Sequence, residues 1–340
     1  MPKSREEEIM FLMRVVTLCV LLLMPCLLQA KAAKKVNNDD LNDPTKVDAD
    51  FAVQGEYVGE ATLAPGKTKT GVQVIARGGG SFEAVFYAGG LPGEGWMRGD
   101  PRTKAAGMTQ DGVTSFQAPE LSAKIKDGTM TLANAAGKEL GQLKRIIRKS
   151  PTLGLKPPEG AVVLFDGKNT DQFEKGRMTE DGLLKEGAIS KYKFQDATIH
   201  LEFRTPYKPK AKGQGRGNSG FYFQGRYEVQ VLDSFGLEGR QNEAGGIYSV
   251  GPPIVNMCYP PLSWQTYDVE FTAAKYEDGK KVKNARITVK HNGVVVQKDT
   301  EVDHATTASK WKEGPEPGPL YIQNHGNPVR FRNIWVLPKK

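Results

Sequence analysis

The sequence predicts an all-β protein with two domains. Gly and Pro are abundant, at 38 and 21 of the 340 residues, and long helical periodicities are scarce. Short segments that alternate apolar and polar residues recur along the chain, with turn residues between them. This pattern is typical of many short strands joined by tight turns. The length is sufficient for two domains, each with its own hydrophobic core.

The N-terminus carries an export signal. Arg14 precedes an apolar run over residues 15–28, and small and basic residues follow it. An apolar run of this length after a basic residue is typical of a secretory signal peptide, and it is short for a membrane span. We expect residues 1–32 to form the signal peptide, with cleavage near Ala30 or Ala32 and export to the periplasm or the cell exterior. An uncleaved membrane anchor is the alternative.

Composition changes divide the rest of the chain. Residues 33–50 are polar and charged and predict a flexible leader. Residues 51–149 contain strand-like segments at regular spacing, which predict a small antiparallel β-domain. Residues 150–160, "SPTLGLKPPEG", form a Pro-rich linker, and residues 161–340 contain the strands of a two-sheet sandwich or jelly roll.

Charge and cysteine content narrow the function classes. The net charge is +8, but the lysines are scattered through turns, and an exported protein is not expected to bind nucleic acid. Only Cys258 remains after signal cleavage, so no intramolecular disulfide is expected in the mature chain. Cleavage also removes the apolar run over residues 15–28, so no stable membrane span is expected there. The sequence contains no CxxC, HExxH, GxSxG or P-loop pattern.

Several stretches of the second domain carry a family resemblance. They are "LFDGKNTDQF" (164–173), "GNSGFYFQGRYEVQVLDSFG" (217–236), "WQTYDVEF" (264–271) and "GPLYIQNHGNPVRFRNIWV" (318–336). In this order they resemble the 3-keto-disaccharide hydrolase family, over residues 161–337. The resemblance implies a concanavalin A-like jelly-roll sandwich. It also implies action on glycosides whose sugar ring carries a ketone at carbon 3.

Alternation places polar side chains on one face of several strands. His200, Glu202 and Arg204 alternate with apolar residues, as do Arg226, Glu228 and Gln230, and Gln323 and His325 share a face near the end of the chain. If these strands are neighbours in one sheet, their polar faces form a concave surface. Planar amides, carboxylates and guanidinium groups suit directional hydrogen bonds to sugar hydroxyls.

These residues supply candidates for the chemistry of a 3-keto sugar. The ketone acidifies the hydrogen on carbon 2, so a general base can remove it and the group on carbon 1 can leave. We expect Glu228 to be the base, with His325 or Glu202 assisting. An ordinary cross-strand ion pair between Glu228 and Arg226 or Arg204 is the alternative. The expected sugar-binding residues are Arg226, Gln230, Gln224, His200, Gln323, Asn218 and Trp264. Tyr222, Tyr248, Tyr259 and Trp264 could stack on a sugar ring or pack in the core.

Three functions compete at this point. The first is an exported enzyme that cleaves 3-keto-glycosides, as a hydrolase or a lyase, with a glycoside or oligosaccharide as substrate. A conventional glycoside hydrolase needs two carboxylates across the bond, and Gln230 stands where the second acid would be expected. A non-catalytic glycan-binding module needs the polar face but no base. No cofactor is required, although His200, Glu202, Glu228 and His325 include ligand types for a divalent metal.

Overall fold

The computed structural model describes residues 39–63 and 66–339. The predicted signal peptide and residues 33–38 of the leader lie outside the described residues. A short 3-10 helix, η1 (Asp40–Asn42), and a four-residue helix, α2 (Asp50–Val53), precede the first strand. None of the helices in the described part is both long and apolar enough to span a membrane.

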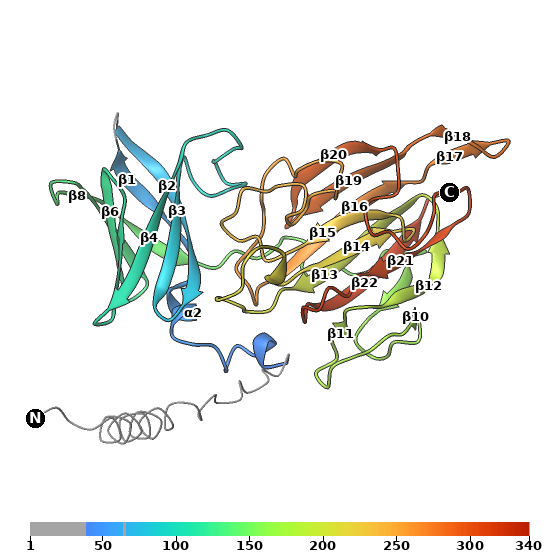
Figure 1. Ribbon diagram of the computed structural model, residues 1–340, viewed down its shortest axis with the longest axis horizontal. Helices are drawn as coiled ribbons and strands as arrows, with labels where there is room; N and C mark the ends of the chain where they lie inside the picture. The colour runs from blue at the N-terminus through green and yellow to red at the C-terminus, as the bar shows by residue number, and fades with distance from the viewer. Residues whose placement is uncertain (1–38, 64–65, 340) are drawn as a thin grey trace, which may run out of the picture. The chain divides into compact units, whose positions relative to one another are not determined.

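The first domain is a closed antiparallel barrel of eight strands (Figure 1). Each strand pairs with the next, and the last returns to the first through pairs such as Glu56 with Ile146. Closure leaves no exposed sheet edge. The strands are β1 (Gly55–Leu63), β2 (Gly66–Gly78), β3 (Ser81–Ala88), β4 (Arg102–Gln110), β5 (Val113–Gln117), β6 (Leu121–Lys126), β7 (Thr129–Asn134) and β8 (Glu139–Ile146).

One barrel strand, β4, has a sequence that does not favour a strand. β4 reads "RTKAAGMTQ" and has few of the β-branched and aromatic residues that favour strands. It pairs with β3 from Arg102 to Met108 and with β5 from Ala106 to Gln110. Pairing on both sides, rather than intrinsic preference, therefore makes this segment a strand.

The second domain is a sandwich of two antiparallel sheets, which confirms the predicted all-β fold. One sheet has the order β10–β12–β21–β14–β15, and the other β11–β22–β13–β16–β19–β20, with β9 paired to β22. The small hairpin β17–β18 stands apart from both. The strands are β9 (Val162–Phe165), β10 (Phe173–Glu174), β11 (Leu184–Lys185), β12 (Ile189–Phe194), β13 (Ala197–Arg204), β14 (Ser219–Phe223), β15 (Tyr227–Val231), β16 (Trp264–Thr272), β17 (Lys275–Glu277), β18 (Lys280–Lys283), β19 (Ala285–His291), β20 (Val294–Val302), β21 (Gly318–Ile322) and β22 (Arg330–Pro338), and a 3-10 turn, η2 (Gly213–Gly215), precedes β14.

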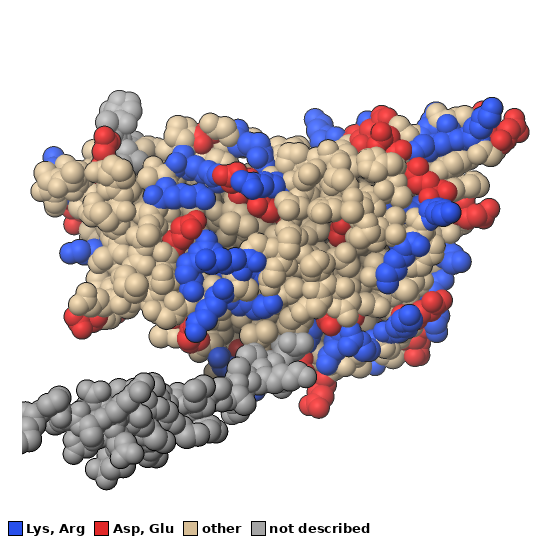
Figure 2. Space-filling view, in the orientation of Figure 1, with Lys and Arg blue, Asp and Glu red and all other residues tan. Residues whose placement is uncertain are grey.

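The barrel and the sandwich belong to one compact unit. At their junction the Arg148 guanidinium contacts the buried Glu56 carboxylate at 2.5 and 2.7 Å and lies 5.0 Å from the centre of the Tyr259 ring. Ile75 and Val85 of the barrel join the hydrophobic core of the sandwich. Lys and Arg side chains gather in the middle of the face shown in Figure 2, between barrel and sandwich.

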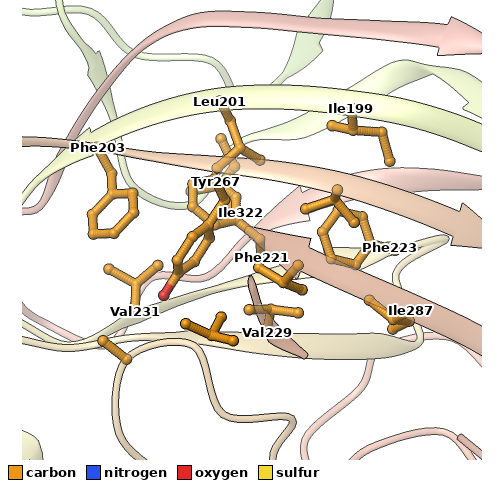
Figure 3. Close-up of a cluster of buried hydrophobic side chains, with 14 of the residues drawn as sticks. Ile199, Leu201, Phe203, Phe221, Phe223, Val229, Val231, Tyr267, Ile287 and Ile322 are labelled. Carbon is orange, nitrogen blue, oxygen red and sulfur yellow. The ribbon is translucent and has the colours of Figure 1, made fainter. Parts of the chain in front are cut away.

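The core of the sandwich fills the space between its two sheets (Figure 3). Each large apolar side chain in this core contributes on the order of 1.5–3 kcal/mol to the free energy of unfolding, because folding removes it from water. The Tyr267 hydroxyl, inside this core, donates a hydrogen bond to the Gln230 carbonyl at 2.7 Å and so joins one sheet to the other. The side chains that alternation predicts to face inward are buried here: Ile199, Leu201, Phe203, Tyr227, Val229, Val231, Tyr267, Val269 and Phe271.

Candidate active site

A polar pocket lies on the outer face of the five-stranded sheet. Tyr222 of β14 stands directly opposite Glu228 of β15, and Gly220 stands opposite Gln230. Gln323 and His325 follow β21, which pairs with the other edge of β14. The cavity has a volume of about 150 Å³. It is lined by Gln214, Asn218, Tyr222, Glu228, Gln230, Tyr248, Thr307, Ala308, Gln323 and His325.

Glu228 is the buried acid of this pocket. Its side chain is 3% exposed, and its Oε1 atom has no hydrogen-bond partner among the described residues. Burial raises the pKa of Glu228 from 4.5 to about 8, and the neighbouring Tyr222 hydroxyl offsets only part of this shift. No ion pair joins Glu228 to an arginine or lysine in the part of the chain that the structure describes. Glu228 therefore holds a proton at neutral pH and becomes a proton acceptor as the pH approaches about 8.

Gly220 makes room for this carboxyl group. A Cβ atom at position 220 would lie 2.0 Å from Glu228 Oε1, far inside van der Waals contact. Because the two residues lie on adjacent strands and the same face, any side chain at 220 would displace the acid. The glycine that ends the "GNSG" stretch is thus a requirement of the site.

Amide groups form one wall of the pocket. The Gln230 Nε2 group donates to Asn218 Oδ1 at 3.1 Å and to Gln214 Oε1 at 3.2 Å, and Asn218 Nδ2 donates to the same Gln214 oxygen at 2.7 Å. On the opposite side, Gln323 Nε2 donates to the Tyr222 hydroxyl at 3.1 Å. These bonds hold the planar head groups in fixed orientations, which suits recognition of sugar hydroxyls.

Exposed residues form the rim. His325, Thr307 and Ala308 are exposed, and Tyr248 is half-buried. Thr307 is tied to Ser249 through a 3.0 Å contact between their hydroxyl groups. Sequence reasoning did not single out Gln214, Thr307 or Ala308, because they lie in turns and loops between strands, where no alternation marks them.

Gln224 and Arg226 do not line the pocket. β14 ends at Phe223 and β15 begins at Tyr227, so both residues belong to the intervening turn, where strand alternation no longer applies. Arg226 donates hydrogen bonds to the carbonyl groups of Lys312, Gly314 and Glu316 at 2.8–3.1 Å. The Gln224 amide reaches the Phe194 carbonyl at 2.9 Å. Arg226 therefore anchors the segment that follows the pocket-lining residues Thr307 and Ala308.

The other predicted polar residues form a second cluster on the seven-stranded sheet. Glu202 and His200 of β13 are fully buried, and His200 Nδ1 lies 2.6 Å from Asp268 Oδ1 of β16. Burial opposes ionisation of Glu202, but hydrogen bonds from His200, Asn333, Gly154 and Arg332 outweigh it and lower its pKa to about 2. The structure thus divides the polar faces between two sheets instead of joining them in one.

This second cluster fastens the linker to the sandwich. The Gly154 amide donates to Glu202 Oε1 at 2.5 Å, Thr152 donates to Asp268 at 2.7 Å, and Asn333 donates to the Leu155 carbonyl at 3.0 Å. Trp264 is nearby, with the Arg332 guanidinium 4.0 Å from its ring centre. Every polar atom of Glu202 is engaged, so it has no free oxygen to accept a proton from a substrate.

The four residues considered as metal ligands are separated in the same way. His200 and Glu202 belong to the linker cluster, whereas Glu228 and His325 line the pocket. Among the described residues, no group of three or more His, Cys, Asp and Glu side chains is arranged to hold a metal ion.

A larger cavity of about 710 Å³ opens in the barrel, between side chains such as Phe86, Tyr87 and Leu132. None of the buried, unpartnered polar atoms found among the described residues lies in its lining. The smaller pocket, which holds Glu228, is therefore the better candidate for chemistry.

An amide-lined pocket around one buried acid, on the outer face of an antiparallel β-sandwich, suits a carbohydrate ligand. The chain belongs to the family described as the 3-keto-alpha-glucoside-1,2-lyase-like domain, which matches residues 160–337. This match confirms the resemblance drawn from the sequence motifs.

Two solved structures from Parabacteroides distasonis ATCC 8503 are similar to this chain, each of a protein proposed to be a glycosyl hydrolase. The first is 34% identical, covers 54% of this chain and 85% of its own, and has a TM-score of 0.48. The second is 19% identical, covers 54% of this chain and 95% of its own, and has a TM-score of 0.37. Comparison with curated proteins gives no match.

Glu202→Gln should destabilise the protein without removing the pocket base. The substitution weakens charge-assisted hydrogen bonds at a fully buried site, which costs about 1–3 kcal/mol. Because the folded-state pKa of Glu202 is lowered from 4.5 to about 2, its stabilising contribution is present above 4.5 and is lost as the pH falls toward 2. Chemical denaturation at several pH values should show the difference from wild type shrinking in acid; a constant difference would contradict this account.

Glu228→Gln should have the opposite effect on stability. The folded protein holds a proton on Glu228 that the unfolded chain releases, so the free energy of unfolding of the wild type falls as the pH rises from 4.5 to about 8. Glutamine has no such proton. Melting curves should therefore show similar stability in acid and a growing advantage of the variant toward pH 8; equal stability throughout would refute the raised pKa.

Proposed function

We propose that the protein cleaves the glycosidic bond of 3-keto-glycosides by removing the proton on carbon 2 and expelling the group on carbon 1. The observation that carries this proposal is the buried Glu228 carboxyl without a cationic partner in a pocket lined by amides. Membership in the 3-keto-alpha-glucoside-1,2-lyase-like family supports a substrate with a ketone at carbon 3.

The proposed reaction begins with proton transfer to Glu228. The electron pair of the C2–H bond forms a C2=C3 double bond, and the ketone oxygen becomes an enolate. The enolate then re-forms the ketone while a C1=C2 double bond forms and the C1–O bond breaks. Addition of water across C1=C2 completes a net hydrolysis, whereas release of the unsaturated sugar is a lyase reaction.

Neighbouring groups have complementary roles in this proposal. The Tyr222 hydroxyl and the Gln323 amide, 3.1 Å apart, provide donors for the enolate oxygen. Burial raises the pKa of Tyr222 well above 10, so the phenol keeps its proton. His325, exposed at the rim, is placed to hydrogen-bond the departing oxygen, which takes its proton from solvent.

A conventional glycoside hydrolase fits the site less well. That mechanism uses two carboxyl groups on either side of the bond, and Glu228 is the one acidic residue among those that line the pocket. A glycan-binding module remains the competing function, because amides and tyrosines would also serve it. Binding without turnover of 3-keto-glycosides would favour the module.

Glu228→Gln should lower kcat/KM for a 3-keto-glucoside by at least about 100-fold, the typical contribution of a general base. In the wild type, kcat/KM should rise with pH and level off above about 8, because the base must be ionised. Steady-state assays with a 3-keto-glucoside and its unoxidised form measure both effects, and product analysis separates hydrolysis from elimination. Glu270→Gln, at an exposed position on β16, is the matched control; unchanged turnover in folded Glu228→Gln would eliminate Glu228 as the base.

We also propose that the protein is exported. The support is the apolar run over residues 15–28 with Arg14 before it. Cell fractionation and N-terminal sequencing of the mature protein should find it outside the cytoplasm, beginning near residue 31 or 33. An intact N-terminus on a cytoplasmic protein would contradict export.

A further inference from the structure

A basic groove of about 570 Å³ lies between the barrel and the sandwich. The barrel contributes side chains from β2 and β3, and the sandwich contributes those on either side of β14 and β15. The lining residues are Arg77, Ser81, Glu83, Lys212, Gly213, Arg216, Asp233, Phe235 and Leu237. None of these residues belongs to the Glu228 pocket.

Arg216 is the buried cation of the groove. Its side chain is 4% exposed, and its Nε atom lies 2.6 Å from Asp233 Oδ2. Its Nη1 atom donates to the Ala76 and Pro209 carbonyl groups, each at 3.3 Å. Its Nη2 atom has no hydrogen-bond partner among the described residues. A guanidinium group with an unused donor is suited to bind an oxyanion.

The acidic residues of the groove are already paired. Asp233 accepts from Arg216, and Glu83 lies 3.1 Å from Arg77 and 3.8 Å from Lys104. Lys212 is exposed and makes no ion pair with any residue that the structure describes. The groove therefore keeps an excess of positive charge, and Figure 2 shows Lys and Arg side chains gathered in this region.

One short loop connects the groove to the Glu228 pocket. Lys212 and Arg216 line the groove, whereas Gln214, between them in the sequence, lines the pocket and accepts hydrogen bonds from Asn218 and Gln230. The pocket has room for about one sugar ring, so the rest of a longer glycoside must lie outside it. The groove lies on the other side of this loop and could receive it.

We propose that the groove binds an anionic substituent, a carboxylate or a sulfate ester, carried by the leaving-group part of the glycoside. This inference rests on the proposed function, since it assigns the ring with the ketone to the Glu228 pocket. Arg216 and Lys212 recognise the anion, and Arg77 screens Glu83 from it. The protein therefore prefers acidic glycosides to neutral ones with the same linkage.

The test compares two 3-keto-disaccharides that differ only in the leaving group, glucose or glucuronate. The wild type should have a KM about fivefold lower for the acidic substrate, as expected for a solvent-accessible ion pair. Lys212→Glu should abolish this preference, so that the KM values for the acidic and neutral substrates become equal. Lys290→Glu, an exposed position on β19 outside the groove, is the matched control and should keep the preference. A leaving group with a sulfate ester in place of the carboxylate distinguishes the two anions.

The outcomes separate this inference from the proposed function. Equal KM values for the acidic and neutral substrates in the wild type, with turnover of both, would overturn the groove assignment alone. If neither substrate reacts, the proposed function fails, and the groove is then tested by calorimetry with the unoxidised acidic disaccharide. The groove assignment is supported if Lys212→Glu lowers the affinity for this disaccharide about fivefold and Lys290→Glu leaves the affinity unchanged. It is overturned if neither variant changes the affinity.

Discussion

The candidate site depends on one physical constraint, the burial of a carboxyl group without a counter-ion. Water would stabilise the charge of an exposed Glu228, and an adjacent cation would do the same in the interior. The pocket supplies neither: its lining consists of amides, hydroxyls and a rim histidine around one acid. Gly220 leaves space for the acid, and the segment anchored by Arg226 closes the pocket from the side of Thr307.

The arginine side chains of this domain are placed so that none of those in the described residues pairs with Glu228. Arg226 is only two residues from Glu228, yet its guanidinium group donates to three backbone carbonyl groups and to the Gln224 side chain, not to Glu228. Glu202 shows the reverse arrangement within the same domain: it is equally buried, but Arg332, Asn333 and a backbone amide surround it, and its pKa is lowered. Two glutamates of similar burial thus acquire different properties, one as an acceptor for protons and the other as a fixed anion that holds the linker.

Alternation along single strands correctly predicts which side chains are buried, as Tyr227, Val229 and Val231 show. It also places Glu228 and Gln230 together on the opposite face. It does not report which strands share a sheet, so it grouped Glu202 with Glu228 although β13 and β15 belong to different sheets. The turn at Gln224 and Arg226 interrupts the pattern, and the loop residues Gln214 and Thr307 reach the pocket only through tertiary packing.

The position of β22 has a consequence for the order in which the protein assembles. This last strand lies between β11 and β13, pairs with β9, and supplies the Asn333 and Arg332 groups that hold Glu202. The barrel strands find all their partners within residues 55–146, so the barrel can close while synthesis continues. The sandwich has to wait with exposed strand edges until its final residues emerge. The topology therefore allows the first domain to fold before the second, whose larger sheet is complete only when β22 is in place.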